Sequence, residues 1–393
     1  MVKTMAIAKR LNLTNIFIFL FLVLFPFGQI TRVTLPIFEY KIPLLPIDLI
    51  AFCGGTYAVW RKFKKPEIFK YFYDFGFVAA LIFFFSVAEF KLVELTYGLF
   101  YLVRLWSYIY FFVYVYNFAA KKGNKELLLN SLLSVSIVSS LFGWIQFFKF
   151  PDIKPFFVYG WDEHLFRLVG TFLDPTFLAL IIVFGIVISM NRIIEKNDNK
   201  YYWFTGFLLV SLSFTYSRAG YLAFLASTAY LLYAKNKIGY ILYPVLILAG
   251  LIFILPTSRN PTISFFRSFS AIARVENYKE TLKVFRKSPI YGVGYNNLCA
   301  ARQKFIGPES FSSHSCSGSD SSLLSILATM GLAGLFSFLS LLWGVGRYFR
   351  SNVIVVSSAI ALLVHSVFSN SIFYSFVIGY LIILMSTQIR VKK

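Results

Sequence analysis

Long runs of apolar residues recur along the whole chain, and short basic or polar segments separate them. Most runs reach the length that a helix needs to cross a hydrocarbon core of ~30 Å. The pattern predicts about twelve transmembrane helices, and so an all-α polytopic membrane protein. By residue number the expected spans are approximately 13–30, 42–60, 75–90, 95–118, 127–148, 175–190, two within 202–234, 238–255, 321–346, 353–368 and 372–388.

The apolar run from Tyr202 to Ala234 permits two topologies. As a single helix it would be ~50 Å long at ~1.5 Å per residue, which exceeds the hydrocarbon core. Basic residues flank the run on both sides, and such flanks prefer the same, cytoplasmic side. We therefore predict a hairpin of two spans, with Ser217 and Arg218 at its outer tip.

The distribution of basic residues predicts which side each connector faces. Lysine and arginine favour cytoplasmic loops, and both ends of the chain are basic, so both termini are expected in the cytoplasm. The predicted map has three parts. Residues 1–256 contain spans one to nine with a smaller outer loop at 151–175, residues 257–320 form a large outer loop, and residues 321–393 contain the last three spans and a cytoplasmic tail.

The excess of basic residues limits the classes of binding partner that we expect. Lys and Arg number 38 against 17 Asp and Glu, while 58% of the residues are hydrophobic. In a protein of many spans the cytoplasmic bias of basic residues explains such an excess, so we do not expect a nucleic-acid partner. The large outer loop is nevertheless basic, against this bias. That charge favours an anionic ligand or an anionic lipid surface.

Within this loop, the run from Ser270 to Lys287 predicts an amphipathic helix that ends before Pro289. Its apolar residues follow helical spacing, and basic residues lie on or near the polar side. The apolar set is Ile272, Val275, Tyr278, Leu282 and Phe285, and the basic set is Arg274, Lys279, Lys283 and Arg286. A helix lying on lipid headgroups with its cations reaching into water is the alternative to a ligand-binding role.

Two further arginines lie next to predicted outer membrane boundaries. Arg218 stands between two apolar runs, where a guanidinium without a partner is costly, so a functional role is expected there. An ion pair with Asp174 is the structural alternative. Arg167 precedes Gly170, which permits close approach of the backbone, and Pro175, which is suited to open a helix.

Two features of the sequence concern structure. Cys299 and Cys316 both map to the outer side, an oxidising compartment, and could form a disulfide. His365 lies inside an expected span, where an ionisable group has either a functional role or an interhelical hydrogen bond. The sequence names no partner for it, and we favour the structural role.

Four pieces of the chain, in order, resemble the superfamily of O-antigen ligases and O-antigen polymerases. These pieces are Arg167 with Gly170-Thr171-Phe172 and Asp174-Pro175, Ser217-Arg218-Ala219-Gly220, Arg274 with Ser288-Pro289 and Gly292-Val293-Gly294, and a Gly-Leu-x-Gly-Leu pattern at 331–335. Members of this superfamily transfer glycans from undecaprenyl diphosphate at the outer face of the bacterial inner membrane. The resemblance covers about residues 160–345, and each piece alone is weakly specific.

The resemblance implies a site in which Arg167, Arg218 and Arg274 bind the substrate diphosphate and Gly292 and Gly294 shape the loop. Arginine suits this task, since its planar fork pairs with phosphate oxygens and stays charged. No metal or other cofactor is expected in this scheme, and the sequence has no His/Asp cluster with convincing ligand spacing. One displacement with one base implies inversion at the anomeric carbon.

The catalytic base is the point at which the chain departs from the family. Counted back from Gly331, the position where the family commonly has a histidine holds Asp320, and His314 lies further upstream. Asp320 is favoured because it stands at the family's histidine position, and burial near lipid would make its carboxylate a stronger base. His314 is favoured because an imidazole is suited to act as a base near neutral pH. Asp320 could also cap the helix that begins at Ser321.

We therefore expect a membrane glycosyltransferase in the bacterial cytoplasmic membrane. Its expected partners are a polyprenyl-diphosphate-linked glycan donor, an acceptor hydroxyl on a glycolipid, glycan or protein, and membrane lipids. The alternatives are an exporter or flippase of lipid-linked glycans and a non-catalytic scaffold that binds anionic lipid. An exporter favours charges strung along a central cavity, whereas the arginines here gather at one face.

Overall fold

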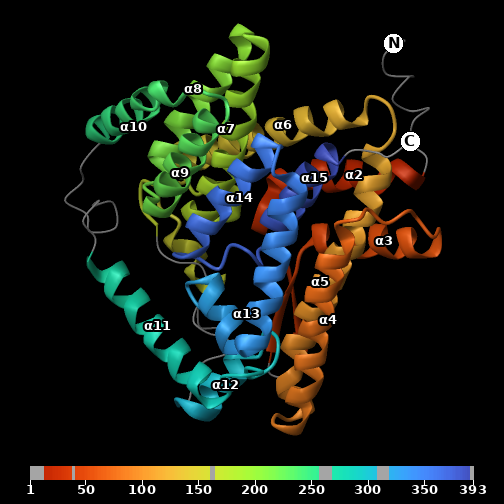
Figure 1. Cartoon of the computed structure of the whole chain (residues 1–393). Coiled ribbons are helices and arrows are strands. Elements are labelled where there is room, and N and C mark those ends of the chain that lie inside the picture. The colour runs from red at the N-terminus through yellow and green to blue at the C-terminus, as the bar shows by residue number, and fades with distance from the viewer. Residues whose placement is uncertain (1–12, 38–39, 160–163, 256–267, 308–317, 390–393) are drawn as a thin grey trace.

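The computed structural model describes residues 13–37, 40–159, 164–255, 268–307 and 318–389 (Figure 1). Helices form nearly all of its regular structure. The α-helices are α2 (Leu13–Leu24), α3 (Pro46–Trp60), α4 (Phe69–Phe85), α5 (Leu92–Ala119), α6 (Asn124–Lys149), α7 (Pro175–Lys196), α8 (Asn199–Phe214), α9 (Arg218–Ala234), α10 (Leu242–Ile254), α11 (Ser268–Lys287), α12 (Leu298–Phe305), α13 (Ser322–Phe349), α14 (Val353–Ser366) and α15 (Ser375–Gln388). Short 3-10 helices are η1 (Phe25–Thr31), η2 (Ser86–Ala88), η3 (Lys154–Tyr159), η4 (Gly170–Phe172) and η5 (Ile238–Tyr240).

Five helices in the described residues are long and apolar enough to cross a membrane, and shorter apolar helices accompany them. The five are Phe69–Ala88, Leu92–Ala119, Asn124–Lys149, Pro175–Lys196 and Ser322–Phe349. The chain is a helical, multi-pass membrane protein. The count of twelve crossings, the side that each end faces and the division into three parts stay predictions.

A small antiparallel hairpin departs from the all-α expectation. Strand β1 (Val33–Ile37) pairs with β2 (Tyr40–Leu44), and Val33 lies opposite Leu44. The second strand takes the first residues of the expected second span, and α3 begins only at Pro46. Proline at the first turn of a helix is favourable because its missing N–H is not needed there, whereas further inside it would break the helix. The proline therefore accounts for the later start of this helix.

Helix α7 lies at the centre of the bundle. It packs against α6, α8, α9 and α14, which surround it in Figure 1. Its consecutive residues Ile181, Ile182, Val183 and Phe184 are all fully buried, as expected for a helix that is apolar on every side. Asp174 caps its first turn by accepting the Thr176 N–H at 2.6 Å. This cap fixes the start of α7, against which other elements pack.

The run 202–234 consists of two helices, as the hairpin interpretation requires. Helix α8 ends at Phe214 and α9 begins at Arg218. The turn between them is held by its own side chains: the Thr215 hydroxyl donates to the Leu212 carbonyl at 2.6 Å and accepts the Ser217 N–H at 3.2 Å. Tyr216 adopts a left-handed conformation with φ 50°. The turn is therefore a tight, ordered connection.

His365 joins the end of α14 to the start of α7. Its Nε2 lies 3.0 Å from the Thr176 carbonyl oxygen, and its Nδ1 lies 2.5 Å from the Ser371 hydroxyl. A carbonyl can only accept, so Nε2 carries the proton and Nδ1 accepts from Ser371. The side chain is fully buried. This arrangement agrees with the structural role that we favoured for His365.

Helix α13 is broken at Gly331 (φ 62°), and the loop before α12 fills the break. The Leu332 and Ala333 N–H groups donate to the Pro289 and Ile290 carbonyls at 2.9 and 3.0 Å instead of to their own helix. The Val293 N–H in turn donates to the Ala328 carbonyl at 3.1 Å. Backbone groups freed by a break in an apolar helix must find partners in the protein. The loop supplies them, so the Gly-Val-Gly turn and the Gly-Leu-x-Gly pattern form one unit.

We predict that Gly292→Ala destabilises this unit. A Cβ at Gly292 would overlap the backbone of Thr329 and Met330, and the residue has φ 68°. We expect a loss of about 2 kcal/mol or more, measured as a lower midpoint of thermal unfolding in detergent. Gly346→Ala is the matched control, since nothing lies within 4 Å of its added Cβ. Equal midpoints for the two variants would contradict the interlocked arrangement.

Candidate active site

Helix α11 is present close to its predicted range, but its faces differ from the expectation. Asn277, Thr281 and Val284 are buried against the rest of the protein. Arg274 and Tyr278 lie half-buried on the same side, whereas the apolar Ile272, Val275 and Leu282 point outward and are exposed together with Lys279, Lys283 and Arg286. The inward face is polar because it binds the entrance of α13 and a buried arginine. Arg274 is thereby separated from the other cations of the helix.

Arg218 is the first residue of α9. Ser217 caps the helix, since its hydroxyl accepts the Gly220 N–H at 3.2 Å. The first N–H groups of a helix and its dipole favour an anion at this end. The half-buried guanidinium of Arg218 adds a full positive charge at the same place. Asp174, which the sequence offered as an ion-pair partner, caps α7 by accepting the Thr176 N–H, and the ion pairs found between described residues do not include one between Asp174 and Arg218.

Arg274 brings a second positive charge close to Arg218, from a helix far away in the sequence. The two charges are near enough to repel each other. Within the described part of the chain, neither guanidinium donates a hydrogen bond or pairs with an acid. Half-buried like charges in this state are unfavourable unless an anion joins them. The pair is therefore a candidate anion-binding centre.

Arg167 lies behind this centre. Its side chain is buried, its Nε and one terminal nitrogen donate to the Thr215 carbonyl at 3.0 and 2.8 Å, and that nitrogen also lies 3.2 Å from the Tyr216 carbonyl. The other terminal nitrogen lies 3.3 Å from Nδ1 of His164. These contacts hold the turn that leads into Arg218. In this arrangement Arg167 positions the centre; direct contact with a diphosphate stays a prediction.

Asp320 stands at the entrance of α13, where Asn277 of α11 holds it. The Asn277 side-chain oxygen accepts the Asp320 N–H and the Ser319 hydroxyl, both at 3.0 Å. The residue at the N-cap position of α13 is Ser321, one place beyond Asp320. Asp320 is half-buried. Its backbone is thus fixed to the same helix that carries Arg274.

Tyr278 connects the two charged residues of α11 and α13. Burial raises the pKa of its hydroxyl, the nearby Arg274 lowers it, and the nearby Asp320 raises it. The hydroxyl donates to the Val367 carbonyl at 2.8 Å. Tyr278 therefore stays neutral and attaches α11 to the end of α14, with Arg274 and Asp320 close by.

Residues 202–339 match the family model of the O-antigen ligases. This region of the chain is similar to the O-antigen ligases, and we call it the O-antigen ligase region. No curated protein sequence matches the chain. The match confirms the resemblance seen in the sequence, and the family implies glycan transfer of the O-antigen ligase type. Arg218, Arg274, Gly292, Gly294 and Asp320 all lie inside the matched residues, whereas Arg167 lies before them.

Sequence reasoning missed two residues that organise the O-antigen ligase region. Asn277 links α11 to Asp320, as described above. Arg302 on α12 is only 1% exposed; its terminal nitrogens lie 3.2 Å from the Thr281 hydroxyl and 3.4 Å from Glu280. The sequence did contain a signal for them, because Asn277, Thr281 and Val284 share one helical face. An inward face that includes polar residues could therefore have been predicted as an alternative.

Some predictions for the O-antigen ligase region fall outside the described residues. His314, the alternative base, is one, and Cys316 is another. Cys299 is disulfide-bonded, while Cys53 is free. Among the described residues, no group of three or more His, Cys, Asp or Glu is placed to hold a metal ion. Metal independence stays a prediction.

Proposed function

We propose that the protein transfers a glycan from a polyprenyl diphosphate donor to an acceptor hydroxyl at the outer face of the membrane. The observation that carries the proposal is the Arg218–Arg274 pair, two mutually repelling guanidinium groups without acid partners among the described residues. A diphosphate offers enough negative charge and enough oxygens to satisfy both forks. The family match over the same residues supports this ligand.

In this proposal each residue has a role that follows from its position in the fold. Arg218, with the N–H groups that begin α9, and Arg274 bind the diphosphate. Arg167 keeps the α8–α9 turn in place through the Thr215 and Tyr216 carbonyls. Gly292 and Gly294 allow the loop to fill the break in α13. The break leaves the first part of α13, with Asp320 before it, as a separate short helix beside α11.

The proposed chemical step is a single displacement. The acceptor oxygen attacks the anomeric carbon while the bond between that carbon and the diphosphate oxygen breaks, and the sugar configuration inverts. The acceptor proton moves to the Asp320 carboxylate or, in the alternative, to His314. Polyprenyl diphosphate leaves with the electron pair of the broken bond. The two arginines stabilise the negative charge that builds on the leaving group, which is where fixed positive charge accelerates a reaction most.

The test is glycan transfer by purified protein in proteoliposomes, with a polyprenyl-diphosphate glycan as donor and candidate acceptors offered separately. We expect a new glycosidic product of inverted configuration and release of polyprenyl diphosphate, with chelators having no effect. The exporter alternative predicts movement of the lipid-linked glycan across the bilayer with no new bond. Translocation without product for any acceptor class would overturn the proposal.

A further inference from the structure

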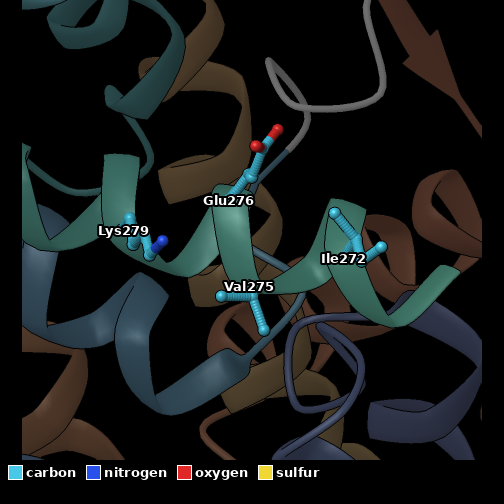
Figure 2. A pocket seen from close by; sticks show the side chains of 4 residues that line it. All are labelled: Ile272, Val275, Glu276 and Lys279. Carbon is cyan, nitrogen blue, oxygen red and sulfur yellow. The ribbon is translucent and has the colours of Figure 1, made fainter. Parts of the chain in front are cut away.

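The outward face of α11 carries exposed apolar side chains interspersed with cations, and we call these apolar side chains the stripe. Figure 2 shows Ile272, Val275, Glu276 and Lys279 around a shallow hollow on this helix. Ile272 is 57% exposed, Val275 49% and Leu282 38%. Lys279, Lys283 and Arg286 share the exposed side. Large apolar side chains in this number rarely face water without a partner.

The stripe leads toward a helix that is a candidate membrane span. Beyond α11 the exposed Ile290 and Tyr291 follow, and the Tyr291 ring lies 6.0 Å from that of Phe85, at the end of α4. Helix α4 is one of the helices apolar enough to cross a membrane, and Phe84 and Phe85 are both exposed. The Tyr291–Phe85 contact therefore joins the exposed end of this candidate span to the segment that follows α11, and we call these apolar side chains together one belt.

We propose that α11 lies on the outer leaflet of the membrane, with its apolar stripe in the acyl-chain boundary and its cations among anionic phospholipid headgroups. Apolar side chains among lysine and arginine on one exposed face suit a helix at the membrane surface, because the long cationic side chains can reach past the apolar ones to anionic headgroups. The belt shared with α4 favours lipid over a protein partner as the occupant. Figure 1 shows α11 lying alongside the bundle rather than inside it.

The orientation of α11 would also fix the depth of Arg274 relative to the membrane, a consequence that rests on the proposed function. Arg274 lies on the inward side of the same helix, so a helix held at the headgroups keeps Arg274 at headgroup depth. The diphosphate of a membrane-anchored donor lies at that depth as well. The membrane thus sets the height of one half of the anion-binding centre.

Spin labels on single added cysteines test the lipid contact in proteoliposomes, with Cys53 replaced by serine and the Cys299 disulfide kept. Labels at Val275→Cys and Leu282→Cys are expected to be severalfold more accessible to oxygen, which partitions into lipid, than to a water-soluble nickel chelate. Ala273→Cys is the matched control: Ala273 is exposed but lies on nearly the opposite side of the helix from Val275, and it should show the reverse preference. These readouts do not depend on glycan transfer.

A second arm tests the role of charge. In vesicles that contain phosphatidylglycerol, replacing Lys279, Lys283 and Arg286 by glutamine should move the Val275 label toward water, and pure phosphatidylcholine should have the same effect on the unaltered helix. Water exposure of the Val275 and Leu282 labels equal to that of Ala273 would overturn the proposal. Protection of both labels from both reagents would overturn it too, because a protein partner would then cover the stripe.

Discussion

Replacing Arg218 by lysine should lower the rate of glycan transfer about 100-fold or more. Lysine keeps the charge but loses the planar fork that can hold two phosphate oxygens at once. In the proposed site this fork acts beside the N–H groups that begin α9, where the Ser217 cap fixes the start of the helix. The measurement is initial transfer rate in proteoliposomes at matched protein content, with donor concentration varied.

Arg274→Lys should behave in the same way, since its guanidinium faces the same anion. Because the two arginines act on one ligand, the double variant should lose less than the product of the single losses. Arg347→Lys is the control: Arg347 is exposed at the end of α13, stacked on Trp343, and should leave the rate unchanged. Small, graded losses at Arg218 and Arg274 alike would instead support a non-catalytic lipid-binding scaffold.

Asp320→Asn should reduce transfer by a factor of about 100 to 10,000, the range typical of a lost general base. Asparagine keeps the size of the side chain and leaves the backbone N–H bond to Asn277 in place. It cannot accept the acceptor proton.

Two comparisons make this prediction decisive. Asp152→Asn, the same change at an exposed carboxylate that accepts the Lys154 N–H, should have no effect, since asparagine can accept the same bond. His314→Ala should retain activity if Asp320 is the base. Loss with His314→Ala and retention with Asp320→Asn would move the base to the histidine. Retention in both variants would remove the proposed base altogether.

The approximate positions of most helices along the chain followed from local pattern. The hairpin within 202–234 could be predicted because a single helix of that length would not fit the membrane, whatever its neighbours. The start of α7 at Pro175 and the helix over Ser268–Lys287 were likewise predictable from short-range signals. The β1–β2 hairpin was missed, since residues 31–41 were interpreted as an outer connector and the end of β2 as the beginning of the next span.

Partners of individual side chains did not follow from the sequence. Arg167 looked like a ligand-binding residue, yet it donates to carbonyls of a turn some fifty positions later in the chain. His365 had no evident partner until Thr176 and Ser371 were placed around it. Such contacts join segments far apart in sequence, and hydropathy contains no information about which segments meet.

By itself the sequence determined the membrane class, the approximate positions of most helices and the similarity of residues 202–339 to the O-antigen ligases, since these depend on local composition and spacing. Only the tertiary structure decided which face of α11 turns inward. Ile272, Val275 and Leu282 would fill the inward face by their hydrophobicity alone, but Asn277 and Thr281 take it because Ser319, the Asp320 backbone and Arg302 need their hydrogen bonds. Buried polar groups must be paired, and this requirement outweighs the burial of an apolar stripe that lipid can cover.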